Sequence, residues 1–225
     1  MENTYRKILF IATMLLCSSA VFGQSNEIKI KFLGNCGLYT TDGNMNIYFD
    51  FPYKSGAFNY MEYDSAELDS IKENSIFVFT HKHPDHYASR RMGKVLRKKK
   101  GQKYGKWNIY KLAQLSDTTA DFSIRAIETN HSLSFKHYSY VMTWHGKKIY
   151  ISGDCETADT ILTMTDLDWA FVPTWIVVDA IEKEKEIDAK MIGIYHLYPA
   201  QIVNNGKPEK YKILENQGEV ITLAY

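Results

Sequence analysis

The sequence predicts one α+β domain in which β residues outnumber helical ones. Short apolar, β-branched and aromatic runs alternate with segments of helical character along the chain. The chain has 225 residues, 45% of them hydrophobic, which is enough for one domain with a sizeable core. No internal repeat, low-complexity segment or Pro/Gly/Ser-rich linker divides it. A single domain is therefore expected, of the α+β class or the related α/β class.

The individual elements follow from local patterns. The turn residues Asp42, Gly43 and Asn44 join two short strands into a hairpin, and Pro84 is placed to open a helix. The predicted strands are 28–33, 37–41, 45–49, 76–79, 107–110, 122–128, 138–144, 148–151, 169–172, 191–195 and 219–223. The predicted helices are 64–72, 84–98, 157–164, 178–189 and 208–216.

The most informative stretch is residues 80–86, which read Thr-His-Lys-His-Pro-Asp-His and directly follow an apolar run. Imidazole nitrogens and carboxylate oxygens suit zinc, iron or manganese. His81 and His83 are two residues apart at a strand end, so both rings can point at one ion. Asp85 and His86 are free to reach a second ion. The stretch predicts a metal site on a strand-to-helix loop.

Three further residues stand at the same kind of position, just past a predicted strand. They are His131, Asp154 and His196. One ion needs three or four protein ligands, and two ions need about six or seven, including a bridge. Singly, each residue suits a surface or capping role, so their order and placement carry the prediction.

This pattern resembles the metallo-β-lactamase-fold hydrolases over nearly the whole of residues 24–225, and it is most similar to their lactonase-like and phosphodiesterase-like branch. The resemblance implies a four-layer αββα sandwich with a two-metal site on one edge of the sheets. It implies that Asp154 bridges the two ions and that Asp50 lies beside the site, although Asp50 also suits a local turn role. The ligands of the first ion would be His81, His83 and His131, and those of the second Asp85, His86 and His196.

The same resemblance implies hydrolysis of a small-molecule ester, lactone or phosphodiester, with two divalent ions activating a water and Asp85 as a catalytic residue. Zinc is the expected metal, and manganese or iron remain alternatives. A β-lactam hydrolase is the rival enzyme, although those zinc enzymes usually use a cysteine ligand and lack a bridge like Asp154. A binding protein that keeps the ions without turnover is the rival from another class.

Other residues are expected outside the ligand set. His145 is expected in a solvated hairpin turn, and Cys155 as a buried thiol. His137 is expected on a strand surface, although it lies close enough to His131 to line the site. The basic run 97–100 ends a helix far from the ions. The aromatic segment 51–63 suits either a lid over the site or ordinary packing.

The first 23 residues predict a signal peptide, with Arg6 and Lys7 before an apolar run too short to span a membrane as a mature helix. The mature chain would begin at Gln24, be exported to a periplasmic or extracellular location and contain no membrane span. Lipid attachment at Cys17 is the less favoured alternative. With 27 Lys and Arg against 26 Asp and Glu, no nucleic-acid partner is expected. One disulfide between Cys36 and Cys155 remains open.

Overall fold

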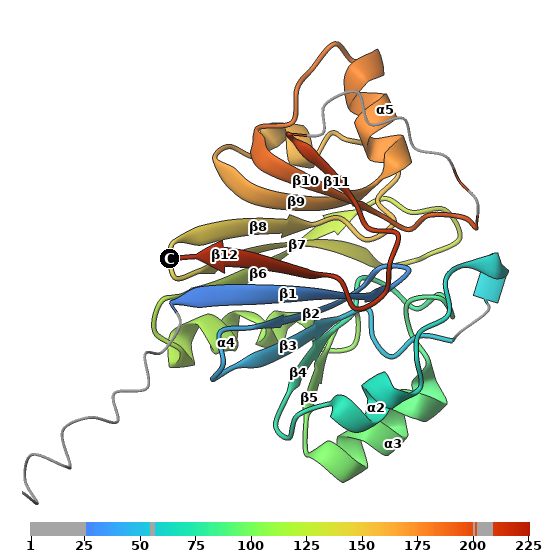
Figure 1. The fold of residues 1–225 in the computed structure, drawn as a ribbon, viewed down its shortest axis with the longest axis vertical. Coiled ribbons are helices and arrows are strands. Elements are labelled where there is room, and N and C mark those ends of the chain that lie inside the picture. Colours follow the sequence, from blue (N-terminus) through green and yellow to red (C-terminus); the bar gives the residue numbers. More distant parts are fainter. Residues whose placement is uncertain (1–25, 55–56, 200, 202–208) are drawn as a thin grey trace, which may run out of the picture.

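The computed structural model describes residues 26–54, 57–199, 201 and 209–225. Two six-stranded sheets pack face to face, and helices cover their outer faces (Figure 1). This arrangement confirms the expected αββα sandwich. The predicted signal peptide, with Cys17 and the start at Gln24, lies outside the described residues.

The first sheet is built mainly from the N-terminal part of the chain. Its strands run antiparallel from the β12 edge as far as β3, and β3, β4 and β5 are parallel. In β1 the apolar residues alternate with lysines, so Ile28, Ile30 and Phe32 point into the core. The strand order is β12 (Val220–Ala224), β1 (Glu27–Gly34), β2 (Gly37–Thr41), β3 (Asn46–Phe49), β4 (Ile76–Val78) and β5 (Gln102–Tyr104).

The second sheet is also mixed. Its four strands β11, β10, β9 and β8 are parallel to one another, and β7 and β6 continue the sheet in antiparallel pairing. The strand order is β11 (Tyr211–Ile213), β10 (Ala189–Tyr195), β9 (Leu167–Pro173), β8 (Lys147–Ile151), β7 (His137–Trp144) and β6 (Phe122–Thr129).

The main core lies between the sheets, where fully buried Phe49 packs against Tyr140. Each outer face is covered by a helix that presents a buried apolar stripe: α3 buries Met92 and Val95, and α5 buries Ile176. The helices are α2 (Ala66–Ser70), α3 (Ser89–Lys99), α4 (Ala113–Thr118) and α5 (Thr174–Glu182), with 3₁₀ turns η1 (Ala57–Asn59), η2 (Ile109–Lys111) and η3 (Ile161–Thr163).

The helix expected at 84–98 begins only at Ser89. Residues 84–86 form a turn in which the backbone N–H groups of His86 and Tyr87 both donate to the His83 carbonyl. Ala88 is extended, and its N–H donates to Pro52 O instead of to a helical partner. The ligand-rich stretch is therefore an irregular loop that ends before the helix.

The strand expected at 107–110 is a turn, and the strand paired with β4 is Gln102–Tyr104. Gly101 permits this pairing, because a Cβ there would lie 2.6 Å from the Phe77 ring and 2.7 Å from Ser75 O. The helix expected at 64–72 is present but shorter, as α2.

Two C-terminal helix predictions were wrong, and the bounds of a third were displaced. Residues 157–164 contain only the η3 turn. The helix expected at 178–189 is α5, which begins directly after Pro173 and ends before β10. In the segment 208–216, whose first residue lies outside the described part, Tyr211–Ile213 instead pairs with β10.

Cys36 and Cys155 are both buried and free, so they do not form the disulfide that was left open. Among the residues that the structure describes, none of the helices has the length and apolar character required to cross a bilayer.

Candidate metal centre

The candidate site lies where the loops following several strands of both sheets meet. Asp50 follows β3, and the loop 80–86 follows β4 of the same sheet. From the second sheet come His131 after β6, Asp154 after β8 and His196 after β10. The Tyr138 N–H, at the start of β7, donates to Thr80 O at 3.0 Å and so ties the loop after β4 to the second sheet. The structure thus brings together the predicted ligands and Asp50.

The first group of side chains consists of His81, His83 and His131. One ring nitrogen from each lies within 4.8 Å of the others. His131 Nε2 is 3.1 Å from His83 Nδ1, and the His81 ring lies against both neighbours. Three imidazole nitrogens that converge in this way can hold one cation.

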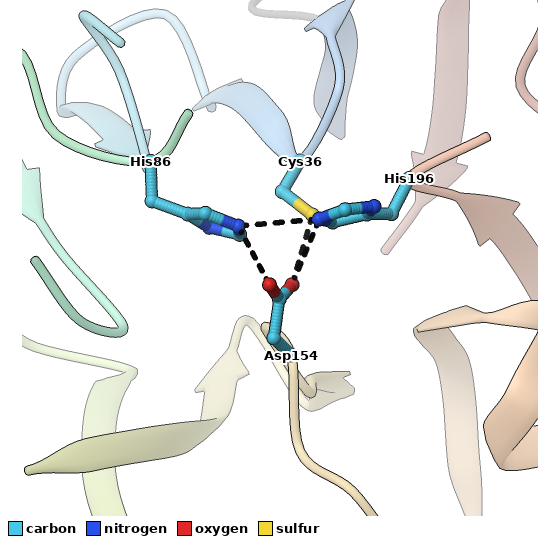
Figure 2. Close-up of side chains that lie close together, drawn as sticks. All are labelled: Cys36, His86, Asp154 and His196. Atoms are coloured by element: carbon cyan, nitrogen blue, oxygen red, sulfur yellow. Dashed lines mark hydrogen bonds and ion pairs between the residues drawn. The ribbon is translucent and has the colours of Figure 1, made fainter. Parts of the chain in front are cut away.

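The second group consists of His86, Asp154, His196 and a residue that the sequence did not indicate, Cys36 (Figure 2). All four are buried. His86 Nε2 lies 3.0 Å from Asp154 Oδ2, and His196 Nε2 lies 3.1 Å from Asp154 Oδ1. The two imidazole Nε2 atoms are 3.3 Å apart.

Asp154 lies between the two groups. Its Oδ2 is 3.8 Å from His81 Nε2 and 3.9 Å from His131 Nε2, in addition to its short distance to His86. A carboxylate in this position can bridge two ions. Asp85 lies at the second group, with Oδ2 at 3.5 Å from His86 Nε2 and 3.6 Å from His196 Nε2.

Hydrogen bonds to Asp50 and Thr80 fix two of the histidine tautomers. The buried Asp50 carboxylate accepts from Thr80 N at 2.8 Å, from the Thr80 hydroxyl at 2.7 Å and from His86 Nδ1–H at 2.9 Å. Because the Thr80 hydroxyl donates to Asp50, its oxygen is left to accept from His81 Nδ1–H at 3.0 Å. In its neutral form each ring therefore keeps its proton on Nδ1 and directs Nε2 at the site, which is the form that ligates metal.

His137 is buried beside the site, so its expected surface position was wrong. Its Nε2 accepts from the Asp154 backbone N–H at 3.0 Å, and its Nδ1–H donates to Thr129 Oγ1 at 2.7 Å. Burial, together with the charge of nearby histidines, lowers the pKa of His137 to about 3 although Asp154 opposes this shift. His137 is therefore a neutral hydrogen-bond acceptor that orients the Asp154 backbone.

Three residues of the site have left-handed backbone conformations that are uncommon outside glycine. Asn35, Asp50 and His196 have φ values of 49°, 46° and 57°. Asn35 also donates through Nδ2 to Asp85 O at 2.9 Å, and the His196 N–H donates to Asn35 O at 3.1 Å. Residues in such conformations persist only where the surrounding structure holds them in place, and they are often found at functional sites.

The electrostatics of the second group favour positive charge. Burial alone would lower the pKa of His86, but Asp154 and Asp50 raise it well above the usual value. Burial alone would raise the pKa of Asp154, yet His196 and His86 hold it well below the usual value. Burial and the neighbouring His86 lower the pKa of His81. Burial, with Asp154, raises the pKa of the Cys36 thiol.

Unpaired buried atoms provide a test of whether a metal fits. Among the described residues, His81 Nε2 and Asp85 Oδ1 are buried without a hydrogen-bond partner, which is costly for a polar atom. Cations at the two groups would provide partners for these atoms. The nitrogen, oxygen and sulfur donors are those that bind zinc and related divalent ions. The residues present therefore fit a metal.

The remaining sequence candidates lie as follows. His145 occupies the β7–β8 turn and its Nε2 lies 3.0 Å from Asp42 Oδ2, away from the ligand set. Cys155 is a buried thiol as expected, donating to Thr157 O. The aromatic segment divides: Phe51, Tyr53 and Tyr63 pack in the core, whereas the Tyr60 ring contacts His196 at 4.2 Å between centroids. Tyr60 is thus a described residue of this segment that contacts the site.

Cys36 is the site residue that sequence analysis missed. It lies in the turn Gly34-Asn35-Cys36-Gly37 that joins β1 to β2. A signal existed, because this turn follows a strand end in the same way as the recognised ligands do. The sequence also allowed a disulfide between Cys36 and Cys155, which would exclude Cys36 as a ligand.

Two packed mixed sheets, outer helices and a histidine-rich edge site together define the metallo-β-lactamase fold, and the chain has this fold. It is similar to the metallo-β-lactamase fold protein YhfI from Bacillus subtilis, with a TM-score of 0.63 and 15% identity over 88% of this chain and 99% of YhfI. No protein-family model and no curated protein matches the chain.

Two further solved structures have the same fold. A putative metal-dependent hydrolase from Parabacteroides distasonis has a TM-score of 0.60 and 19% identity over 84% of this chain and 94% of that one. The diiron β-hydroxylase CmlA from Streptomyces venezuelae has a TM-score of 0.54 and 10% identity over 89% of this chain and 54% of CmlA.

Proposed function

We propose that this protein is a metal-dependent hydrolase that uses two divalent ions to activate a water. The observation that supports this proposal most strongly is the position of Asp154, whose two carboxylate oxygens lie between two groups of histidines. His81, His83 and His131 would hold one ion. Asp85, His86 and His196 would hold the other, with Asp154 shared.

When bound, two such cations lower the pKa of a bridging water, polarise the substrate oxygen and stabilise developing negative charge. The chain's own residues prepare this chemistry. Asp50 and Thr80 hold His86 and His81 in the ligating tautomer, and His137 orients the Asp154 backbone. Asp85, which lies beside the second group, would orient the water and later pass a proton to the leaving group.

The proposed substrate is a small ester, lactone or phosphodiester. The structural relatives named hydrolases support hydrolysis as the reaction class. We propose zinc as the metal, because histidine and carboxylate ligands suit it, with manganese or iron as the other outcomes of the test. A β-lactam hydrolase and a binding protein without turnover are the two competing functions.

The test is elemental analysis of protein purified without chelator, combined with hydrolysis assays on a chromogenic bis-phosphodiester, a lactone and a carbapenem. His83→Ala is compared with His145→Ala, a matched control whose histidine lies outside the ligand set. We expect about two ions per chain, and ester, lactone or phosphodiester hydrolysis that is lost only in His83→Ala. Bound ions without hydrolysis of any probe would favour the binding protein. Absence of bound metal would refute the site.

We also propose export after removal of residues 1–23, which rests on the basic and apolar segments of that stretch. N-terminal sequencing of the protein from its native cell tests this proposal. A mature chain that begins at Gln24 is expected, and one that begins at Met1 would refute it.

A further inference from the structure

The Cys36 side chain is directed at the second group of candidate ligands. Its Sγ lies 3.8 Å from Asp154 Oδ1, and the residue is 1% exposed. Figure 2 shows Cys36, His86, Asp154 and His196 pointing toward one another from four separate segments. This is a cluster of four ligand-competent groups, and the thiol is one of its members.

The donor atoms of the four residues lie within 4.8 Å of one another, and four of the distances between them are close to those around one tetrahedral ion. Zinc–nitrogen bonds of 2.0–2.1 Å in a tetrahedron place two nitrogens about 3.3 Å apart, and a 2.3 Å zinc–sulfur bond places sulfur about 3.5 Å from an oxygen ligand. The distance between the two imidazole Nε2 atoms is 3.3 Å. The imidazole-to-carboxylate distances are 3.0 and 3.1 Å, and the sulfur-to-carboxylate distance is 3.8 Å.

We propose that Cys36 is a thiolate ligand of the second ion, together with His86, His196 and Asp154. This inference rests on the proposed metal-dependent function. Asp85 then acts mainly toward the water, because its Oδ2 lies farther from the two imidazoles, at 3.5 and 3.6 Å, than Asp154 does. Binding releases the thiol proton to solvent, since the thiolate is the ligating form.

The other free cysteine shows what an ordinary buried thiol does in this fold. Cys155 donates to the backbone carbonyl of Thr157 at 3.2 Å and belongs to an apolar cluster on the outer face of the second sheet. Cys36 faces a carboxylate and two imidazoles instead. In that position, a thiolate bound to a cation would be stabilised more than a neutral thiol.

A thiolate changes which metal the second position prefers. Sulfur is a soft ligand that selects zinc, whereas manganese prefers oxygen ligands. The first group, made of three imidazoles, has no such sulfur. The two positions are therefore expected to differ in their discrimination between zinc and manganese, with the second one favouring zinc more strongly.

X-ray absorption at the zinc edge on the full-length, zinc-loaded protein tests the assignment. The expected spectrum contains sulfur at about 2.3 Å from zinc. Because only the second ion has a sulfur ligand, the spectrum should average to one sulfur for every two zinc ions. This sulfur contribution should be lost in Cys36→Ser and retained in Cys155→Ser. The double variant Cys17→Ser/Cys155→Ser retains Cys36 as its sole cysteine and should keep the sulfur, which decides the question even if Cys36→Ser does not fold.

Cobalt substitution gives an independent measurement, because thiolate ligation produces a sulfur-to-cobalt charge-transfer band. Two bound ions with only nitrogen and oxygen ligands, and no such band, would refute the role of Cys36 while leaving the proposed hydrolase intact. Failure to bind any metal would refute both. Sulfur that persists in Cys36→Ser would also overturn the assignment.

Discussion

Asp50→Asn is the substitution that best separates positioning from ligation. The Asp50 carboxylate belongs to neither group of candidate ligands and instead accepts hydrogen bonds from Thr80 and His86. Asn preserves the shape and tolerates the left-handed backbone at this position, where φ is 46°. Its amide group would donate to His86 Nδ1, which forces the proton onto Nε2 and removes the lone pair needed for metal binding.

The magnitude follows from the contacts that are lost. A hydrogen bond to a charged group contributes about 1.5–3 kcal/mol, and partners that orient metal-binding histidines typically change affinity by about 10–100-fold. We therefore expect zinc affinity to fall about 10–100-fold in Asp50→Asn. Competition titration against a chromogenic zinc chelator measures this change directly.

Asp42→Asn is the matched control, since the Asp42 carboxylate interacts with His145 in a distant turn. Circular dichroism should show that both variants fold. Unchanged zinc affinity in a folded Asp50→Asn variant would refute the argument that Asp50 sets the His86 tautomer.

Three further outcomes are expected. Gly153→Ala should destabilise the protein by about 2–3 kcal/mol in urea unfolding, because a Cβ there would lie 2.6 Å from Thr80. Gly146→Ala is the control: it is also at positive φ but in open space, and should destabilise by only about 1 kcal/mol. Equal destabilisation by the two substitutions would contradict the close-contact argument. Asp42→Asn should cost about 1 kcal/mol at neutral pH. Burial raises the pKa of Asp42, but hydrogen bonds from two backbone N–H groups and His145 lower it by more, so its net pKa is depressed. The stabilisation from the carboxylate is therefore present above its usual pKa and is lost as pH falls through the depressed value. Urea unfolding of both proteins from pH 7 to 3 measures this, and a stability difference between wild type and variant that does not change with pH would refute it. Chelation of the metal should lower the midpoint of thermal unfolding, removing about 4 kcal/mol when free metal had been 1,000 times its dissociation constant, and an unchanged midpoint would indicate that no ion is bound by the folded state.

The parts of the site that could be predicted from sequence are those with local signals. The loop 80–86 concentrates its donors in one short run, and His131, Asp154 and His196 each follow an apolar strand. Because the strands of a sandwich end at shared edges, strand-end placement was enough to group them. Most strands could be predicted from equally local signals, either a short continuous apolar run, as in β4, or apolar residues alternating with polar ones, as in β1.

The parts that could not be predicted depend on contacts between distant segments. In β7 nearly every residue is buried, so alternation does not reveal which face His137 occupies. The segment around Tyr211–Ile213 forms a strand only because β10 offers it backbone partners. Nothing local in Gly34-Asn35-Cys36-Gly37 shows that its turn points the thiol at Asp154.

The placement of β12 has a consequence for how the protein unfolds. This strand completes the first sheet beside β1, although residues 122–213, between β5 and β12, supply all the strands of the second. The first sheet is therefore not a contiguous piece of polypeptide, and the candidate donor groups come from the loops of both sheets. A proteolytic fragment that contains either half would lack an edge strand or half of the donors. We therefore expect cooperative, all-or-none unfolding, with capture of the ions possible only after distant segments have joined.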